Sequence, residues 1–305
     1  MSIVVFGSIN MDLVAHTPRL PSPGETIIGR SFTTVPGGKG ANQAVACARL
    51  GAAVELVGRL GNDVFGEQLL VHLQAQGVGT RYLSREESIS SGVALIEVDD
   101  AAENNIIVIP GANGRVGQAD LLHLITALSQ AKLLLLQLEI PLEVVIAAAH
   151  LANERGVKVI LDPAPAQELP AEVYPLVDLL TPNETEAASL TGLTIANIDD
   201  AVIAACKLLS FGARRVIIKL GNQGALLADE KGVELFPAFP VTAVNTVAAG
   251  DAFNGALAVA LSKDQPLRTA IRWGLAGGAL SVTQFGAQES MPDLGMLQQI
   301  LFEVG

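Results

Sequence analysis

The sequence predicts an α/β fold: a central, mostly parallel sheet flanked by helices in three layers, with a small β-sheet lid. Two patterns predict it. Apolar strand-like segments alternate with helical segments along most of the chain, and two groups of short strands interrupt that alternation. Hydrophobic residues make up 50% of the chain and aromatic residues only 4%, so the interior must be built from Ala, Val, Leu and Ile, as is common in sheets covered by helices.

The chain of 305 residues is expected to form a single domain over 1–305, with lid strands inserted at about 12–35 and 89–110. Its 31 acidic and 19 basic residues give a formal charge of −12, which argues against binding to nucleic acid or to an anionic membrane and favours a small substrate. The two cysteines, Cys47 and Cys206, lack metal-like spacing, and both are expected to be buried free thiols.

No segment has the pattern of a transmembrane helix. The most apolar region, 133–152, is broken by Glu139, Pro141 and Glu143, which indicates a buried strand followed by a helix. The N-terminus enters a strand directly and lacks the basic region, apolar stretch and cleavage site of an export signal, so we expect a cytoplasmic protein.

The first strand is predicted at 3–7, and polar residues follow it at once. The segment Ser8-Ile9-Asn10-Met11-Asp12 lies at the carboxyl end of that strand, the edge where open α/β sheets bind ligands. A spacing of two places Asn10 and Asp12 on one face of an extended segment. Both residue types also form turns, so the pattern alone supports a turn and a ligand site equally.

Short strands without a long helix are predicted between 13 and 35, where proline and glycine punctuate the chain. A second pair follows at 92–98 and 105–109. Together these segments interrupt the alternation of helix and strand twice, and we interpret them as one small sheet that stands off the domain. Such a sheet exposes an apolar face and free edges unless something covers them.

A glycine-rich loop, Gly37-Gly38-Lys39-Gly40, precedes an amphipathic helix predicted at 41–50. By itself the loop is a weak signal for phosphate binding and is equally consistent with a plain helix start. It is not a P-loop, because no strand followed by Gly-x4-Gly-Lys-Ser/Thr is present. A strand at 54–60 and a helix at 64–76 come next.

A repeated alternation follows the lid, and it predicts parallel strands with right-handed crossovers. The elements are strands at 132–138, 157–162 and 176–181, with a helix at 142–154. Acidic residues mark two of the strand ends. Glu139 follows the first of these strands, and Asp162 begins Asp-Pro-Ala-Pro-Ala, where a structural role as a turn residue and a role in a site are equally supported.

The segment Asn183-Glu184-Thr185-Glu186 is predicted to open a helix, because Asn is a preferred N-cap and Glu186 lies three residues later, as in a capping box. A strand at 215–220 leads into Lys219-Leu220-Gly221-Asn222-Gln223-Gly224, whose glycines are consistent with a simple hairpin before a strand at 225–228. We expect the last long helix at 266–284.

The stretch from Asn245 to Gly255 carries the strongest chemical signal. Small residues from Ala248 to Gly250 remove side chains just before an apolar run with helical spacing, so a helix should begin there with free N–H groups that attract anions. Asp251 lies in the first turn. A carboxylate beside a phosphate is repelled unless it serves as a base, although the helix dipole alone would also favour an acidic residue at this position.

Two strings far apart in the chain resemble the signatures of one enzyme family. Gly37-Gly38-Lys39-Gly40-Ala41-Asn42-Gln43-Ala44 resembles the N-terminal signature of the ribokinase-like (PfkB) family of sugar kinases, and Ala248-Ala249-Gly250-Asp251-Ala252-Phe253-Asn254-Gly255 resembles the C-terminal one. Two such strings in this order are highly specific. The resemblance covers the chain from Gly7 to about Ser290 and implies a Rossmann-type three-layer fold with a β-lid.

The resemblance implies a role for each candidate site residue. The sugar would be held by Asn10, Asp12, Gly38, Lys39, Asn42, Glu139 and Asp251. Asp251 would be the catalytic base within an anion hole formed by Ala248, Ala249 and Gly250. ATP would be contacted by Asn183, Lys219, Gly221, Gly224, Gly250 and Leu275, and Glu186 would reach Mg²⁺ through water. Leu275 replaces a His that is often found near the adenine in the family.

A second departure from the family concerns a monovalent cation such as K⁺. The family's Asp at the head of the C-terminal motif, which coordinates that cation, is Asn245 here. The other ligands implied by the resemblance are Val247, Ser281, Gln284 and Gly286, with Ser290 nearby. Because an amide brings no formal charge, we expect either a site filled only at high potassium or an amide that hydrogen-bonds the loop without an ion.

The resemblance implies an ATP-dependent kinase that phosphorylates the O5 hydroxyl of D-ribose, since Gly-Ser-Ile-Asn-x-Asp, Gln-Leu-Glu and Thr-Pro-Asn-Glu-Thr-Glu occur together with the two signatures. The alternatives are a fructokinase or a relative acting on deoxyribose, another ketose or a nucleoside, and a sugar sensor without catalytic activity. A homodimer joined through the lids is also expected, from the apolar alternation of Val93 and Leu95 with Ile107 and Ile109.

Overall fold

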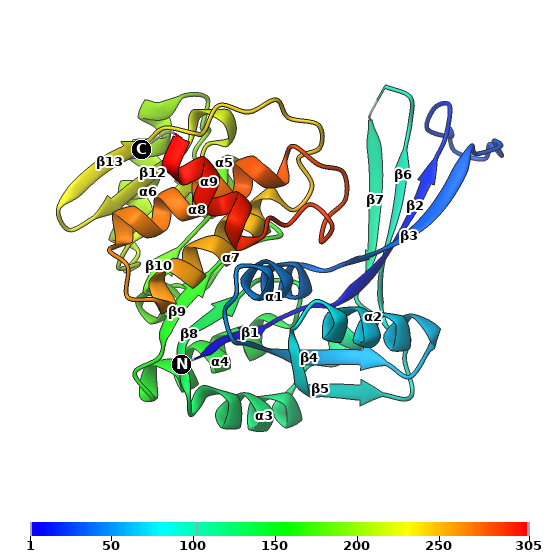
Figure 1. The fold of residues 1–305 in the computed structure, drawn as a ribbon, viewed down its shortest axis with the longest axis horizontal. Helices are drawn as coiled ribbons and strands as arrows, with labels where there is room; N and C mark the ends of the chain where they lie inside the picture. Colours follow the sequence, from blue (N-terminus) through cyan, green and yellow to red (C-terminus); the bar gives the residue numbers. More distant parts are fainter. Residues whose placement is uncertain (1, 102, 304–305) are drawn as a thin grey trace.

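The computed structural model describes residues 2–101 and 103–303, which form one large sheet and one small sheet (Figure 1). The large sheet has the strand order β13-β12-β11-β10-β9-β8-β1-β4-β5. Its strands are β1 (Ser2–Phe6), β4 (Val54–Gly61), β5 (Gly79–Glu86), β8 (Ala131–Leu136), β9 (Lys158–Leu161), β10 (Leu179–Leu180), β11 (Val216–Lys219), β12 (Ala225–Asp229) and β13 (Gly232–Phe236).

The strands from β5 to β11 pair in parallel, and only the β11–β12 and β12–β13 pairs at one edge are antiparallel. Neighbouring residues of β1 lie in different cores: Ile3 and Val5 belong to one hydrophobic cluster, whereas Val4 and Phe6 belong to the other. Since successive side chains of a strand point to opposite faces, both faces of the sheet are covered. The predicted three-layer, mostly parallel α/β fold is confirmed.

Helices pack against both faces. The first face carries α1 (Lys39–Arg49), α2 (Val64–Ala75), α7 (Ala249–Ser262), α8 (Leu267–Ser281) and α9 (Leu294–Glu303). The second carries α3 (Gln118–Leu128), α4 (Leu142–Glu154), α5 (Glu184–Thr191) and α6 (Ile198–Ser210). None of the helices described is long and apolar enough to cross a membrane.

The small sheet has the order β3-β2-β6-β7 and stands off the large one (Figure 1). Its strands are β2 (Asn10–His16), β3 (Ser31–Gly37), β6 (Gly92–Val98) and β7 (Asn104–Ile109), which confirms the prediction of one lid built from two separate segments. The register places Asn10 beside Gly37 on one side and Gly92 on the other. The root of the lid therefore lies directly after β1, at the carboxyl edge of the large sheet.

Helices α1 and α7 approach each other closely on the first face. A Cβ atom at Gly255 would lie 2.4 Å from the Cβ of Ala46, so only glycine permits this separation. The close packing brings the N-terminal part of α1, with Asn42 and Gln43, against the first turn of α7, with Asp251. Segments about two hundred residues apart thus build one site.

Three expectations need correction. The strand expected at 176–181 is reduced to β10, because a 3₁₀ turn over Tyr174–Leu176, with Pro175 in its first positions, precedes it. The helix expected at 266–284 ends at Ser281 and is followed by α9, so it is not the last helix. Cys47 is a buried free thiol as expected, but Cys206 is exposed, because the buried face of α6 consists of other residues.

Candidate active site

Helix α7 begins where the sequence predicts an anion-binding helix start. Ala248 adopts the left-handed conformation with φ of 59°, and α7 starts at Ala249. The first α-helical hydrogen bond runs from the Ala252 N–H to the Ala248 carbonyl, so the amides of Gly250 and Asp251 have no partner within the helix. The tight turn and the small side chains leave these amides, together with the positive end of the helix dipole, facing outward.

Asp251 is the buried carboxylate at this helix start, with only 4% of its surface exposed. Each of its oxygens accepts an amide N–H: Oδ2 from Asn42 at 3.0 Å and Oδ1 from Gln43 at 3.1 Å. Burial raises the pKa of Asp251 above its ordinary value, whereas Lys39 and the two amides favour the ionised form. A carboxylate with this balance can accept a proton from a group placed next to it.

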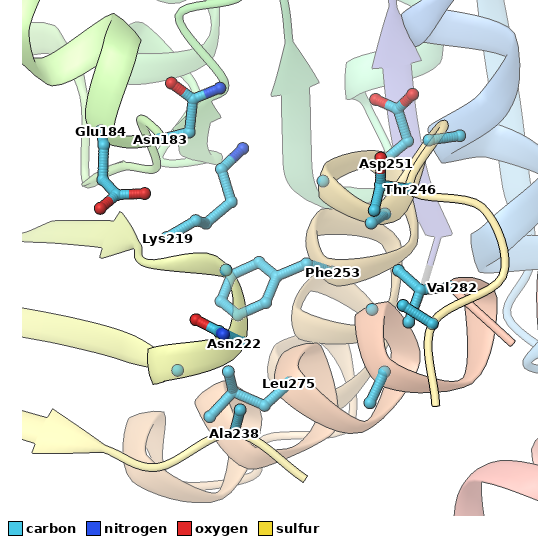
Figure 2. Close-up of a pocket in the computed structure, with 18 of the residues that line it drawn as sticks. Asn183, Glu184, Lys219, Asn222, Ala238, Thr246, Asp251, Phe253, Leu275 and Val282 are labelled. Carbon is cyan, nitrogen blue, oxygen red and sulfur yellow. The ribbon is translucent and has the colours of Figure 1, made fainter. Parts of the chain in front are cut away.

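A cavity of about 750 Å³ opens on one side of Asp251 (Figure 2). It runs between the start of α5, the β11–β12 hairpin, α7 and α8. Leu275 and Ala238 lie at the end away from Asp251 and Lys219 (Figure 2), and Phe239 and Phe253 add to the apolar lining. Its near end is polar, and the side chains of Lys219 and Asn183 lie there (Figure 2). A long cavity with an apolar end and a polar end fits a nucleotide, with its base and its phosphates at opposite ends.

The polar end is built from an ion pair and a helix cap. Lys219 Nζ lies 2.8 Å from Asp162 Oδ1; the Asp162 side chain is almost fully buried, and that of Lys219 is 13% exposed. Asn183 caps α5 in a capping box with Glu186, which confirms the predicted cap. Burial raises the pKa of Glu186, and Lys219 opposes that rise. Asp162 therefore belongs to the site as well as to the turn after β9.

A second cluster of polar groups lies on the other side of Asp251, at the root of the lid. Glu139 Oε2 accepts the Ser8 hydroxyl at 2.5 Å and the Lys39 N–H at 3.0 Å. Asn10 Oδ1 accepts an N–H of Asn113 at 2.7 Å. The amide NH₂ group of Asn10 has no acceptor among the described residues, so it can donate to a ligand. Such donors and acceptors suit the hydroxyl groups of a sugar.

Lys39 lies between the two clusters. It lines the cavity, and its backbone binds Glu139. Burial by itself would lower the pKa of Lys39, but Asp251 and the surrounding carboxylates raise it above its ordinary value. The backbone here depends on Gly38, which has φ of 87° and approaches Asn10 so closely that a Cβ would lie 2.7 Å from its nitrogen.

Asp12 adds an unusual acid to the second cluster. Burial and, after it, Glu139, Glu289 and Asp251 raise the pKa of Asp12 to about 7. No hydrogen bond from the described part of the chain reaches its carboxylate. The protein thus holds an acidic group where its ionisation is unfavourable, an arrangement typical of residues that bind a ligand.

The structure brings most of the predicted site residues together. Among the predicted nucleotide and anion-hole residues, Asn183, Glu186, Lys219, Gly221, Gly224, Ala248, Ala249, Gly250, Asp251 and Leu275 all line the cavity. Asn10, Asp12 and Glu139 form the second cluster, Gly38 approaches Asn10, and Asn42 binds Asp251. The residues expected around a cation, namely Asn245, Val247, Ser281, Gln284, Gly286 and Ser290, do not line the cavity, and no group of three acidic, His or Cys side chains suited to a metal occurs in the described residues.

Asn245 is already engaged within its own loop. Its Oδ1 accepts the Val247 N–H at 2.7 Å, and its backbone N–H donates to the carbonyl of Val282 at 3.1 Å. Of the two outcomes expected for this position, the geometry resembles the one in which a neutral amide stabilises the loop.

Sequence reasoning did not identify Gln43, Gln137 or Asn113 as site residues. All three are buried amides whose partners lie about a hundred residues away or more in the chain. The available signal was weak: Gln43 is a polar residue on the otherwise apolar face of α1, and Gln137 ends a run of four leucines.

Comparison with known proteins agrees with this geometry. A family model described as pfkB family carbohydrate kinase matches residues 1–294. The chain is 40% identical to a ribokinase of Haemophilus influenzae over 95% of both chains, and 36% identical to a deoxyribokinase of Salmonella typhimurium over 99% of both. It superposes with a TM-score of 0.91 on an Arabidopsis thaliana ribokinase complexed with ribose and ATP, at 33% identity over 98% of both chains.

The raised pKa of Asp12 predicts a pH-dependent gain in stability for Asp12→Asn. Because the pKa rises from 3.8 in the unfolded chain to about 7 in the folded one, the folded state holds the proton more tightly, and stability is lost as the pH rises through that window. At 1.4 kcal/mol per pKa unit, the gain in unfolding free energy should be about 2–3 kcal/mol larger at pH 8 than at pH 5.

Urea denaturation of both proteins at the two pH values measures this difference. Asp199→Asn, an exposed control on α6, should change stability equally at both. An equal gain in unfolding free energy for Asp12→Asn at pH 5 and pH 8 would show that the folded protein does not raise the pKa of Asp12.

Proposed function

The chain belongs to the pfkB family of carbohydrate kinases, and we propose that it transfers the γ-phosphoryl group of ATP to O5 of D-ribose. One observation carries the proposal: the buried carboxylate of Asp251 lies at a helix start, between a long cavity suited to a nucleotide and a cluster suited to sugar hydroxyls. A group in that position can take the proton of a hydroxyl that attacks a phosphate.

The sugar is held by the second cluster. Asn10 donates and Asp12 and Glu139 accept hydrogen bonds from its hydroxyl groups, while the Asn42 side chain, fixed on Asp251, borders the reacting hydroxyl. These groups place O5 beside Asp251. Excluding water from this position limits the hydrolysis of ATP, which is the role we assign to the lid over Asp12.

The nucleotide enters as its Mg²⁺ complex, with the phosphates at the polar end of the cavity. Lys219, Gly250 and Asp251 line that cavity, and Glu186, which also lines it, would hold the magnesium ion through water. The adenine lies against the apolar lining at Leu275, where a hydrophobic contact replaces the family's His. Magnesium neutralises charge on the phosphates when it is bound with ATP.

In the reaction, the O5 hydroxyl loses its proton to Asp251 as its oxygen bonds to the γ-phosphorus. The bond from that phosphorus to the β,γ-bridging oxygen breaks, and ADP leaves with the electron pair. The amides at the start of α7 stabilise the charge on the transferring group. Because ATP is the phosphate donor, we propose that the protein works in the cytoplasm.

Other kinases of the family remain as second candidates. The deoxyribokinase relative favours 2-deoxyribose as the nearest alternative, and fructose, tagatose or a nucleoside would suit the same chemistry. A sugar sensor without catalysis is disfavoured. A protein that had lost the activity would normally lack the base or have a disrupted glycine loop, and both Asp251 and Gly38 are present.

A coupled assay of ADP release tests the substrate directly. Ribose, 2-deoxyribose, fructose, tagatose, adenosine and inosine are compared at equal concentrations, with each sugar omitted in turn as the blank. We expect the highest kcat/KM with ribose. A preference for fructose or a nucleoside, with ribose inert, would overturn the assignment, and no turnover with any of them would favour the sensor.

We further propose a homodimer joined through the lids. Leu95 lies opposite Ile107, and Val93 opposite Ile109, on the sheet face that does not carry Asp12. Leu95, Ile107 and Ile109 are 39%, 61% and 44% exposed. An exposed apolar face on a thin sheet is unfavourable in water, and a second lid would cover it while leaving the Asp12 face to the sugar.

Light scattering at micromolar protein should give twice the mass of one chain. Ile107→Asp should shift the protein to monomers, whereas the control Ile203→Asp, at a similarly exposed position on α6, should not. A wild-type protein that is monomeric in this measurement would contradict the lid dimer.

We propose that potassium activates the enzyme only weakly. The neutral Asn245 side chain is already bound to the Val247 N–H, so the loop before α7 keeps its shape without an ion. Turnover in a potassium-free Tris buffer should remain close to the maximum reached in a potassium titration, with choline chloride to keep ionic strength constant. Asn245→Asp should become more sensitive to potassium, because a carboxylate attracts the cation.

Strong activation of the wild-type enzyme by low millimolar potassium would overturn this proposal. Asn245→Asp with unchanged potassium sensitivity would show that residue 245 does not tune the site.

A further inference from the structure

Two buried glutamines that have no part in the mechanism above lie behind Asp251. Gln43, the fifth residue of α1, is fully buried and donates from Nε2 to two carboxylates: Asp251 Oδ1 at 3.1 Å and Asp162 Oδ2 at 2.9 Å. Gln137, directly after β8, is also fully buried, and its Nε2 donates to Gln43 Oε1 at 2.6 Å. The four side chains form one chain of hydrogen bonds with a single direction.

That direction matters because the two ends of an amide differ in chemistry but hardly in shape. If the Gln43 amide turned over, its carbonyl oxygen would face two carboxylates, which repel it. The N–H of Gln137 gives that oxygen a partner on the opposite side. Gln137 thereby fixes the orientation in which Gln43 presents its donors to Asp251 and Asp162.

Gln137 has an unsatisfied group of its own. Its Oε1 is buried without a hydrogen-bond partner in the described part of the structure. A buried acceptor that has lost its water is unfavourable. An apolar side chain of the same size would remove that acceptor but would leave Gln43 Oε1 without its donor, so the polar side chain at 137 serves Gln43.

The chain of bonds also joins the two halves of the site. Lys219, at the polar end of the cavity, binds one oxygen of Asp162, and Gln43 binds the other. The same amide then holds Asp251. The ion pair on the nucleotide side and the base are therefore connected through a single NH₂ group.

We propose that Gln43 is a positioning residue for the base Asp251 and that Gln137 sets the orientation of the Gln43 amide. The inference rests on the proposed function, because it requires that Asp251 accept the proton. Gln43 keeps the Asp251 oxygen aimed at the reacting hydroxyl, and it ties that aim to the Lys219–Asp162 pair. Neither glutamine needs to touch the sugar or the nucleotide.

The test compares kcat and both KM values in Gln43→Met, Gln137→Met and the double variant, since Met has a similar length and donates no hydrogen bond. The substrate is whichever sugar of the panel the wild-type enzyme turns over fastest. From the typical free-energy contribution of hydrogen bonds to charged groups, we expect kcat to fall by about 10- to 100-fold in Gln43→Met and by about 3- to 10-fold in Gln137→Met. The KM values for sugar and ATP should change by less than about threefold, because binding groups are untouched.

The double variant provides the decisive comparison. If Gln137 acts only through Gln43, its replacement should have no further effect once Gln43→Met is present. Two reductions that multiply would show independent roles and overturn the inference, as would normal kcat in either single variant. If Gln43→Met does not fold, Gln137→Met decides alone. A lower kcat with nearly unchanged KM values supports the inference, and an unchanged kcat overturns it.

Cys47→Ala is the control for packing damage. Cys47 is fully buried one turn further along α1, and its loss leaves a cavity without removing a donor to Asp251. It should lower the melting temperature and keep kcat. A fall in kcat that follows melting temperature in all variants would contradict a positioning role. No turnover with any sugar in the wild-type enzyme would overturn the proposed function and this inference with it.

Discussion

The buried carboxylate of Asp251 at the start of α7 is the constraint on which the rest of the site depends. A carboxylate removed from water is unfavourable unless charge and hydrogen bonds compensate for its lost hydration. The compensation comes from Lys39 and two amides near the start of α1, about two hundred residues away, and from the dipole of α7 itself. The close contact between α1 and α7 is therefore a requirement of the chemistry as well as of the packing.

The same constraint explains how acids are distributed around the site. Against the effect of burial, Asp251, Asp162, Glu139 and Glu186 raise the pKa of the partly buried Lys39. After burial, Glu139, Glu289 and Asp251 raise the pKa of Asp12. These carboxylates repel one another when no ligand is bound. A sugar whose hydroxyl groups donate hydrogen bonds to Asp12 and Glu139 would stabilise their ionised forms, so this substrate would supply part of the compensation that the protein itself lacks.

Local patterns predicted the fold and those parts of the site that lie within one segment. The helix start expected within 248–251, the cap of α5 and the strands of the small sheet each follow from neighbouring residues, and all are confirmed. Elements without a strong local pattern were missed: β5 is an edge strand with exposed arginines, and β13 has five residues. The Gln137–Gln43 chain could not be predicted, because it exists only where β8 and α1 meet α7 in three dimensions.

The most direct test of the central claim is turnover by Asp251→Asn. The substitution keeps the size of the side chain and removes its ability to accept a proton. We expect kcat to fall by about 10² or more while sugar affinity, measured by calorimetry, changes little, because the remaining sugar contacts are intact. A variant that retains near-normal turnover would contradict the account, since Asp251 would then be no more than a favourable residue at a helix start.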